Sequence, residues 1–193
     1  MAQQNVRPGS SLLRVIIYVI LALIVIVGLA VLITWLVIRP RKLVYSVDYG
    51  SVSSFNISRD HLTANFDFVL NGRNPNHRVT VYYDSIEVRV VYEDQTMAYG
   101  SLEPFHQPHK NVTRLEAKLL ARSVPLVGSI SRDLRRERAS GDVEFGIYLD
   151  ARVRFKVGSW KSGRRKLRVK CDPVLVHVGS TKHFESTPCD VDL

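Results

Sequence analysis

The sequence contains one long charge-free segment, residues 15–38, made almost entirely of Val, Ile and Leu. A helix rises about 1.5 Å per residue, so this segment would reach roughly 36 Å and cross a hydrocarbon core about 30 Å thick. A cleaved signal peptide has a shorter apolar core of about 7–15 residues, followed by a small-residue cleavage site that is missing here. The segment therefore predicts an uncleaved single-pass transmembrane helix.

This helix divides the chain into unequal parts. Residues 1–14 form a short polar head that we expect in the cytosol, and residues 15–38 form the span. Residues 39–60 are predicted to be a juxtamembrane linker and a first strand. Residues 61–193 have a usual size for one folded domain. The sequence thus predicts one globular domain held at a membrane by one helix.

The sequence gives opposing signals about the side of the membrane on which this domain lies. Three cations follow the span closely and two precede it, so the positive-inside rule weakly favours a cytosolic domain. Two glycosylation sequons, at Asn56 and Asn111, have meaning only in the lumen or outside the cell. The two cysteines, Cys171 and Cys189, permit one disulfide in an oxidising compartment. We expect the domain to lie outside the cell.

Several segments of the outer domain alternate between apolar and polar residues, as half-buried strands do. Such alternation covers residues 62–70, 86–92 and 143–157, and an apolar face continues at 167–171. Turn residues at 71–76 are expected to end the first of these strands. The run 143–157 is long enough to predict a bend or a passage from one sheet to another. Short strands separated by turns favour a mainly β fold, a β-sandwich.

One segment has a helical period instead. Leu126, Ile130 and Leu134 recur every four residues, with Ser123 as a candidate cap and Pro125 near the first turn. The pattern predicts one short helix over residues 125–138 that ends near Gly141.

The strongest charge feature is a predicted basic hairpin, residues 151–170, with nine cations and no acid. Strand alternation gathers cations of each strand on one face, where facing like charges cost energy that a polyanion would relieve. An alternative is a solvated face whose charges prevent edge-to-edge pairing. The expected polyanion is an anionic lipid, an acidic cell-wall polysaccharide or an acidic protein, and not nucleic acid, for which no motif is present. The candidate polyanion-binding residues are Arg152, Arg154, Lys156, Lys166, Arg168 and Lys170.

Catalytic and cofactor motifs are missing from the sequence. His106 and His109 resemble half a metal site, but no further ligand stands at a usual spacing, and an exposed pair of histidines is the simpler interpretation. There is no nucleophile elbow, phosphate loop or dinucleotide fingerprint. We expect no enzyme activity, no cofactor and no metal.

Taken together, the residues resemble the plant late-embryogenesis-abundant group-two proteins, in particular the harpin-induced and non-race-specific-disease-resistance-like membrane branch. The resemblance covers nearly the whole chain. It is carried by the single anchor ending in Arg39-Pro40-Arg41, by Asn74-Pro75-Asn76, Tyr82-Tyr83-Asp84, Phe105-His106-Gln107 and Asn111-Val112-Thr113, and by the segments 153–162 and 167–171.

The resemblance implies an immunoglobulin-like or fibronectin-like sandwich, a cytosolic N-terminus and an outward domain. It implies a plasma-membrane or plasmodesmal location and a role in responses to pathogens. It assigns no catalytic residue, and Asn74-Pro75-Asn76 is better interpreted as a structural turn than as a site. The expected function is a non-enzymatic defence protein whose outer domain is an adhesion or signalling module. The alternative is a stress or desiccation protein that protects or tethers the membrane through lipid contact.

Overall fold

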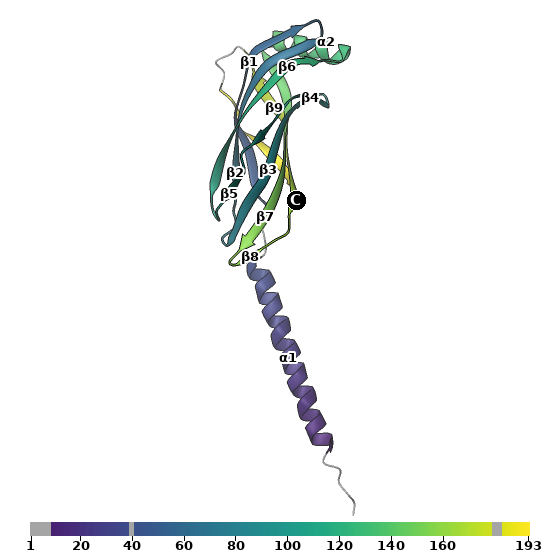
Figure 1. Ribbon diagram of the computed structural model, residues 1–193, viewed down its shortest axis with the longest axis vertical. Coiled ribbons are helices and arrows are strands. Elements are labelled where there is room, and N and C mark those ends of the chain that lie inside the picture. Colours follow the sequence, from purple (N-terminus) through teal and green to yellow (C-terminus); the bar gives the residue numbers. More distant parts are fainter. Residues whose placement is uncertain (1–8, 39–40, 179–182) are drawn as a thin grey trace, which may run out of the picture. The chain divides into compact units, whose positions relative to one another are not determined.

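The computed structural model describes residues 9–38, 41–178 and 183–193 (Figure 1). The chain divides into two compact units, Met1–Pro40 and Arg41–Leu193. The second unit therefore begins at Arg41 and not near residue 61, because the strand expected in the linker is an integral part of the sheet.

The first unit contains helix α1 (Gly9–Ile38), which begins six residues before the predicted span. Within it, Leu13–Leu32 is long and apolar enough to cross a membrane. All side chains from 13 to 32 are exposed, as expected of a surface that lipid would cover. Residues 1–8 of the predicted head lie outside the described residues.

The second unit is a β-sandwich with one short helix, as the alternation predicts. Sheet neighbours follow the order β4-β3-β7-β9-β10-β1-β2-β6, with β5 beside β3 and β8 beside β7. The described strands are β1 (Val44–Ser58), β2 (His61–Arg73), β3 (Val79–Tyr92), β4 (Gln95–Leu102), β5 (Phe105–Gln107), β6 (Val112–Pro125), β7 (Asp142–Val157), β8 (Trp160–Lys161), β9 (Arg165–His177) and β10 (Thr187–Asp192).

The core lies between two layers of strands that β10 joins. One layer contains β1, β2 and β6, and the other contains β3, β4, β5, β7, β8 and β9. β10 pairs with β1 on one side and with β9 on the other. Phe66 of β2 meets Phe145 of β7 edge-to-face across the core, with ring centroids 5.3 Å apart. The inward residues of the alternating segments are buried, except Phe155 and Val157 at the end of β7, which are partly exposed; this burial confirms the sandwich.

The long strand β7 stays within one layer. It pairs with β3 and β9 along its length, so the predicted passage between sheets is wrong. Two register irregularities occur instead, one opposite Tyr83 and Ser85 and one between Phe145 and Ile147. Bulges of this kind let a long strand bend without leaving its sheet.

Strand β2 is longer than its turn residues indicate. Asn71 and Gly72 remain paired with β1 and β6, and the strand ends at Arg73. A Cβ at Gly72 would approach the Tyr45 ring to 2.8 Å. This glycine therefore marks a close approach of an aromatic ring to the backbone, not a turn.

The predicted helix exists but starts later. β6 continues through Pro125, and α2 runs from Gly128 to Ser140, with Val127 as an N-cap that makes no side-chain capping bond. Ser123 is no cap, since it lies within β6. Gly141 ends the helix with φ +89, in the left-handed region where glycine is favoured. Leu126, Ile130 and Leu134 are buried, so the helical period identified the correct face.

Helix α2 and the point of chain entry lie at opposite ends of the sandwich (Figure 1). At the α2 end, Ser131 Oγ donates to Asp60 in the β1–β2 turn at 2.7 Å. At the other end, β1 begins three residues after Arg41 and pairs with the last residue of β2, Arg73. We call this the entry end, because the chain enters the sandwich there from the anchor.

Candidate functional site

The predicted basic residues lie on the neighbouring strands β7 and β9. Arg152 stands directly opposite Lys166, a facing pair of like charges. Arg168 instead stands opposite Asp150, and Lys170 opposite Tyr148. Lys156 stands opposite Lys161 of the short strand β8. The structure thus brings the six cations onto connected strands but gives them different neighbours.

Two of the six cations are neutralised by carboxylates. Arg154 forms an ion pair with Asp84, and Arg164 approaches the same carboxylate at 3.3 Å. The hydrogen bond from Arg154 holds the pKa of Asp84 below its usual range. Lys170 Nζ lies 3.5 Å from Asp172. A hydrogen bond with Tyr148 raises the pKa of Lys170, so that amine is fully charged at neutral pH.

The remaining four cations are exposed and form no ion pair within the part of the chain that the structure describes. Arg152, Lys166 and Arg168 line a shallow depression of about 360 Å³. Glu87 and Asp150 also line it; Asp150 stands opposite Arg168 and pairs with Arg89 at 2.5 Å. The depression is therefore of mixed charge, with the facing pair Arg152 and Lys166 at its basic part. We call Arg152, Lys166 and Arg168 the basic patch.

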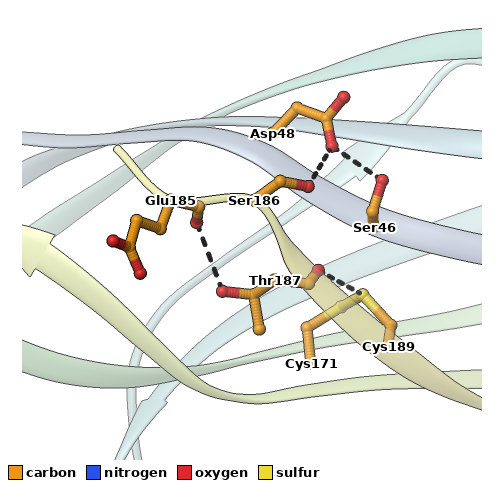
Figure 2. The surroundings of a disulfide bond; sticks show 7 residues. All are labelled: Ser46, Asp48, Cys171, Glu185, Ser186, Thr187 and Cys189. Carbon is orange, nitrogen blue, oxygen red and sulfur yellow. Dashed lines mark hydrogen bonds between the residues drawn. A yellow bond between two sulfur atoms is a disulfide. The ribbon is translucent and has the colours of Figure 1, made fainter. Parts of the chain in front are cut away.

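The C-terminal segment is fastened to the sandwich by a disulfide and by hydrogen bonds (Figure 2). Cys189 of β10 forms a disulfide with the buried Cys171 of β9, with the Cα atoms 4.2 Å apart. Ser186 donates to Asp48 of β1 at 2.8 Å, and Ser46 donates to the same carboxylate at 2.7 Å. The bond from Ser46 lowers the pKa of Asp48. The disulfide links β9 to β10, the strand that joins the two layers.

Buried polar side chains at the entry end form a network, which the sequence did not predict. Asn74 donates to the carbonyls of Val79 and Pro108 at 2.8 and 3.0 Å. Asn76 donates to Asn74 Oδ1 at 3.0 Å and to the Arg41 carbonyl at 2.9 Å. Asn74-Pro75-Asn76 is therefore a structural turn, as interpreted above, and its amides hold three segments together. The short spacing of two asparagines around a proline was the available signal.

Gln107 completes this network from β5. Its amide donates to the Gly72 carbonyl at 2.6 Å, and its oxygen accepts from the Tyr83 hydroxyl at 3.2 Å. Tyr83 and Tyr45 share a hydrogen bond of 2.5 Å between their hydroxyls, which joins the two layers. Among the described residues, no buried side-chain nitrogen or oxygen lacks a partner. The network is thus fully satisfied, which is typical of a structural element and leaves no group for a ligand.

Within the part of the chain that the structure describes, the neighbouring histidines are not joined by further metal-ligand residues. His106 is exposed and stacks on Tyr82, with ring centroids 5.8 Å apart, and His109 is also exposed. Residues 9–38, 41–178 and 183–193 contain no cluster of three His, Cys, Asp or Glu that could hold a metal. Both sequon asparagines, Asn56 and Asn111, are exposed and accessible to a sugar; their glycosylation stays a prediction.

Comparison with known proteins identifies the family. The sequence profile of the late embryogenesis abundant family LEA-2 matches residues 69–172, more than half of the chain. The chain belongs to the LEA-2 family. Within it, NDR1/HIN1-like protein 10 of Arabidopsis thaliana is 38% identical over 95% of this chain and 85% of its own length. NDR1/HIN1-like protein 3 of the same plant is 36% identical over 93% and 80%. The expected resemblance to this membrane branch is confirmed.

Two solved structures share a likeness with the LEA-2 chain. A crystal structure of an Archaeoglobus fulgidus protein covers 62% of this chain and 93% of its own, with a TM-score of 0.30 and 14% identity. A solution structure of an Arabidopsis thaliana protein covers 74% and 85%, with a TM-score of 0.36 and 14% identity.

Proposed function

We propose that this LEA-2 protein is a non-enzymatic, membrane-anchored plant defence protein whose β-sandwich is an adhesion or signalling module outside the cytosol. The carrying observation is the combination of one apolar helix of spanning length with one sandwich domain closed by a disulfide. Disulfides persist in oxidising compartments, and the exposed sequon asparagines fit the same side of the membrane. The plasma membrane, including plasmodesmata, is the proposed location.

The chemistry of the domain favours binding over catalysis. The buried polar groups of the entry end are all used in holding the fold together. Charged residues outside the core pair with one another or point to solvent. A surface of this kind acts by contact with a partner.

The basic patch supplies one such contact. Arg152 and Lys166 face each other without a carboxylate between them, so an acidic polysaccharide lying across β7 and β9 relieves their repulsion. Charge attraction of this type is tolerant of ligand shape, as adhesion to a heterogeneous polymer requires. We propose acidic cell-wall polysaccharide as the ligand of this patch.

Plants that lack the protein test the function as a whole. We expect them to lose resistance to pathogens and to retain drought tolerance, and re-expression of the full chain should restore resistance. Loss of drought tolerance with normal resistance would contradict the defence role and favour the membrane-protective alternative. Re-expression of a chain whose basic patch is changed to Gln then measures how much of the function the patch carries.

A further inference from the structure

The entry end of the sandwich carries an exposed tryptophan. Trp160 lies in the β7–β8 hairpin and is 63% exposed. It stands opposite Val157, which in turn stands opposite Val79 at the start of β3. Asn74 donates to the Val79 carbonyl and also contacts Asn76, which binds Arg41. The tryptophan therefore lies at the same end of the sandwich as the residue by which the chain enters it.

A groove with basic residues in its lining lies at the same end of the sandwich as this tryptophan. This open groove has a volume of about 710 Å³, and His77, Arg78, His109 and Lys156 contribute to its lining. No carboxylate lines the groove, and neither Arg78 nor Lys156 has an ion pair among the residues that the structure describes. On its rim, Lys161 Nζ lies 4.0 Å from the centre of the Tyr82 ring.

We propose that the entry end is a phospholipid-binding surface that rests on the membrane in which the chain is anchored. Trp160 lies at headgroup level, and the groove lined by Arg78 and Lys156 receives the phosphate of an anionic headgroup. Tryptophan favours the interface because its ring is apolar and its N–H is polar, and cations nearby add attraction to anionic lipid. This surface is separate from the basic patch. The proposal rests on only one part of the proposed function, namely that the chain is anchored in a membrane.

Lipid contact of Trp160 can be measured on the full chain in nanodiscs. The sequence has two tryptophans, so a Trp35→Phe change leaves Trp160 as the only indole. In discs that contain phosphatidylserine, we expect blue-shifted emission, quenching by headgroup-proximal brominated lipid, and about twofold weaker quenching by acrylamide than in zwitterionic discs. High salt and the double change Arg78→Gln/Lys156→Gln should remove this difference.

A matched control moves the tryptophan to a site outside the entry end. Tyr99 of β4 is 79% exposed and stands opposite Arg89, far along β3 from Val79. The combination Trp35→Phe/Trp160→Phe/Tyr99→Trp should show solvent-like emission in every disc. Equal acrylamide quenching of Trp160 and the Tyr99→Trp indole would overturn the proposal, and so would contact that does not depend on lipid charge. Nanodiscs expose both membrane faces, so the result is independent of which side the domain occupies in cells and of the defence role.

Discussion

Arg41 and Asn76 exchange two hydrogen bonds at the first residue of the sandwich. The Arg41 N–H donates to Asn76 Oδ1 at 2.7 Å, and Asn76 Nδ2 donates to the Arg41 carbonyl at 2.9 Å. One side-chain amide thus replaces a strand partner for a residue that lies before β1. The chain is thereby fixed to the β2–β3 connection before the first strand begins.

An Asn76→Ala change should lower the free energy of unfolding by roughly 2 kcal/mol, because it leaves the partly buried N–H and C=O of Arg41 without partners. Unfolding of the full chain in non-ionic detergent, followed by tyrosine signals, measures this value. Asn65→Ala is the matched control, since Asn65 is exposed and makes only a 3.4 Å contact with Ser54. That control should change stability by at most about 0.5 kcal/mol. Equal effects of the two changes would show that Asn76 is not structural.

Loss of the disulfide between Cys171 and Cys189 should also destabilise the domain. The bond spans 18 residues, and a loop of this length contributes about 3 kcal/mol in the chain-entropy model. Cys189→Ser is the better variant, because Cys171 is fully buried and a hydroxyl there would add a separate cost. Reductant should destabilise the wild type and leave Cys189→Ser unchanged. Two thiols that alkylate readily in unreduced native protein would refute the bond.

Changing the basic patch, Arg152, Lys166 and Arg168, to Gln should weaken retention on acidic pectin by about tenfold or more at low salt. Wild-type retention should fall steeply as salt shortens the Debye length. The control is Lys118→Gln/Arg122→Gln/Arg132→Gln, which removes three exposed cations from β6 and α2 with the same change in net charge. Equal losses in both variants would mean that net charge, and not the patch, governs retention.

The Tyr45–Tyr83 pair predicts a loss of stability at alkaline pH. Burial raises the pKa of Tyr83 to about 12, and burial also raises the pKa of Tyr45 well above its usual value. A folded-state pKa above the unfolded value near 10 gives stability that is complete below about pH 10. As pH rises toward 12, each such tyrosine should cost about 1.4 kcal/mol per pH unit.

Tyr83→Phe tests this pH dependence. It removes one titrating group of the pair, while Tyr92 and Tyr148, whose pKa values are also raised, remain; stability should therefore fall less steeply than in the wild type between about pH 10 and 12. At neutral pH the free energy of unfolding of the variant should be lower than that of the wild type, because the side-chain oxygen of Gln107 loses its hydrogen-bond donor. Unfolding curves at several pH values measure both effects. An unchanged slope would show that Tyr83 does not titrate in this range.

The helical period of apolar residues and the apolar–polar alternation along strands predicted most of the fold, because they indicate which side of a helix or strand is buried. The predicted strand 143–157 coincides with β7 within one residue, and the helical face of Leu126, Ile130 and Leu134 is correct. Boundaries were less predictable where tertiary contacts decide them. Pro125 opens no helix because it pairs with His61 at the start of β2.

The site was harder to predict because it depends on partners distant in sequence. Strand parity placed Arg154 correctly on the outer face, but Asp84, which neutralises it, is 70 residues away. The polar network likewise joins Arg41, Asn76 and Gln107 from separate segments, and turn chemistry alone indicates only the middle one. The register places the exposed Trp160 opposite Val157, which separates it from Val79, and this position cannot be found from the sequence alone.

The side of the membrane on which the sandwich lies is the central claim, and protease added outside intact cells tests it most directly. Chains with an epitope at either end allow both sides to be followed. We predict that external protease removes the C-terminal epitope and leaves the N-terminal epitope intact, and that a glycosidase shift is lost on Asn56→Gln or Asn111→Gln. A C-terminal epitope that survives until the membrane is permeabilised would contradict the account.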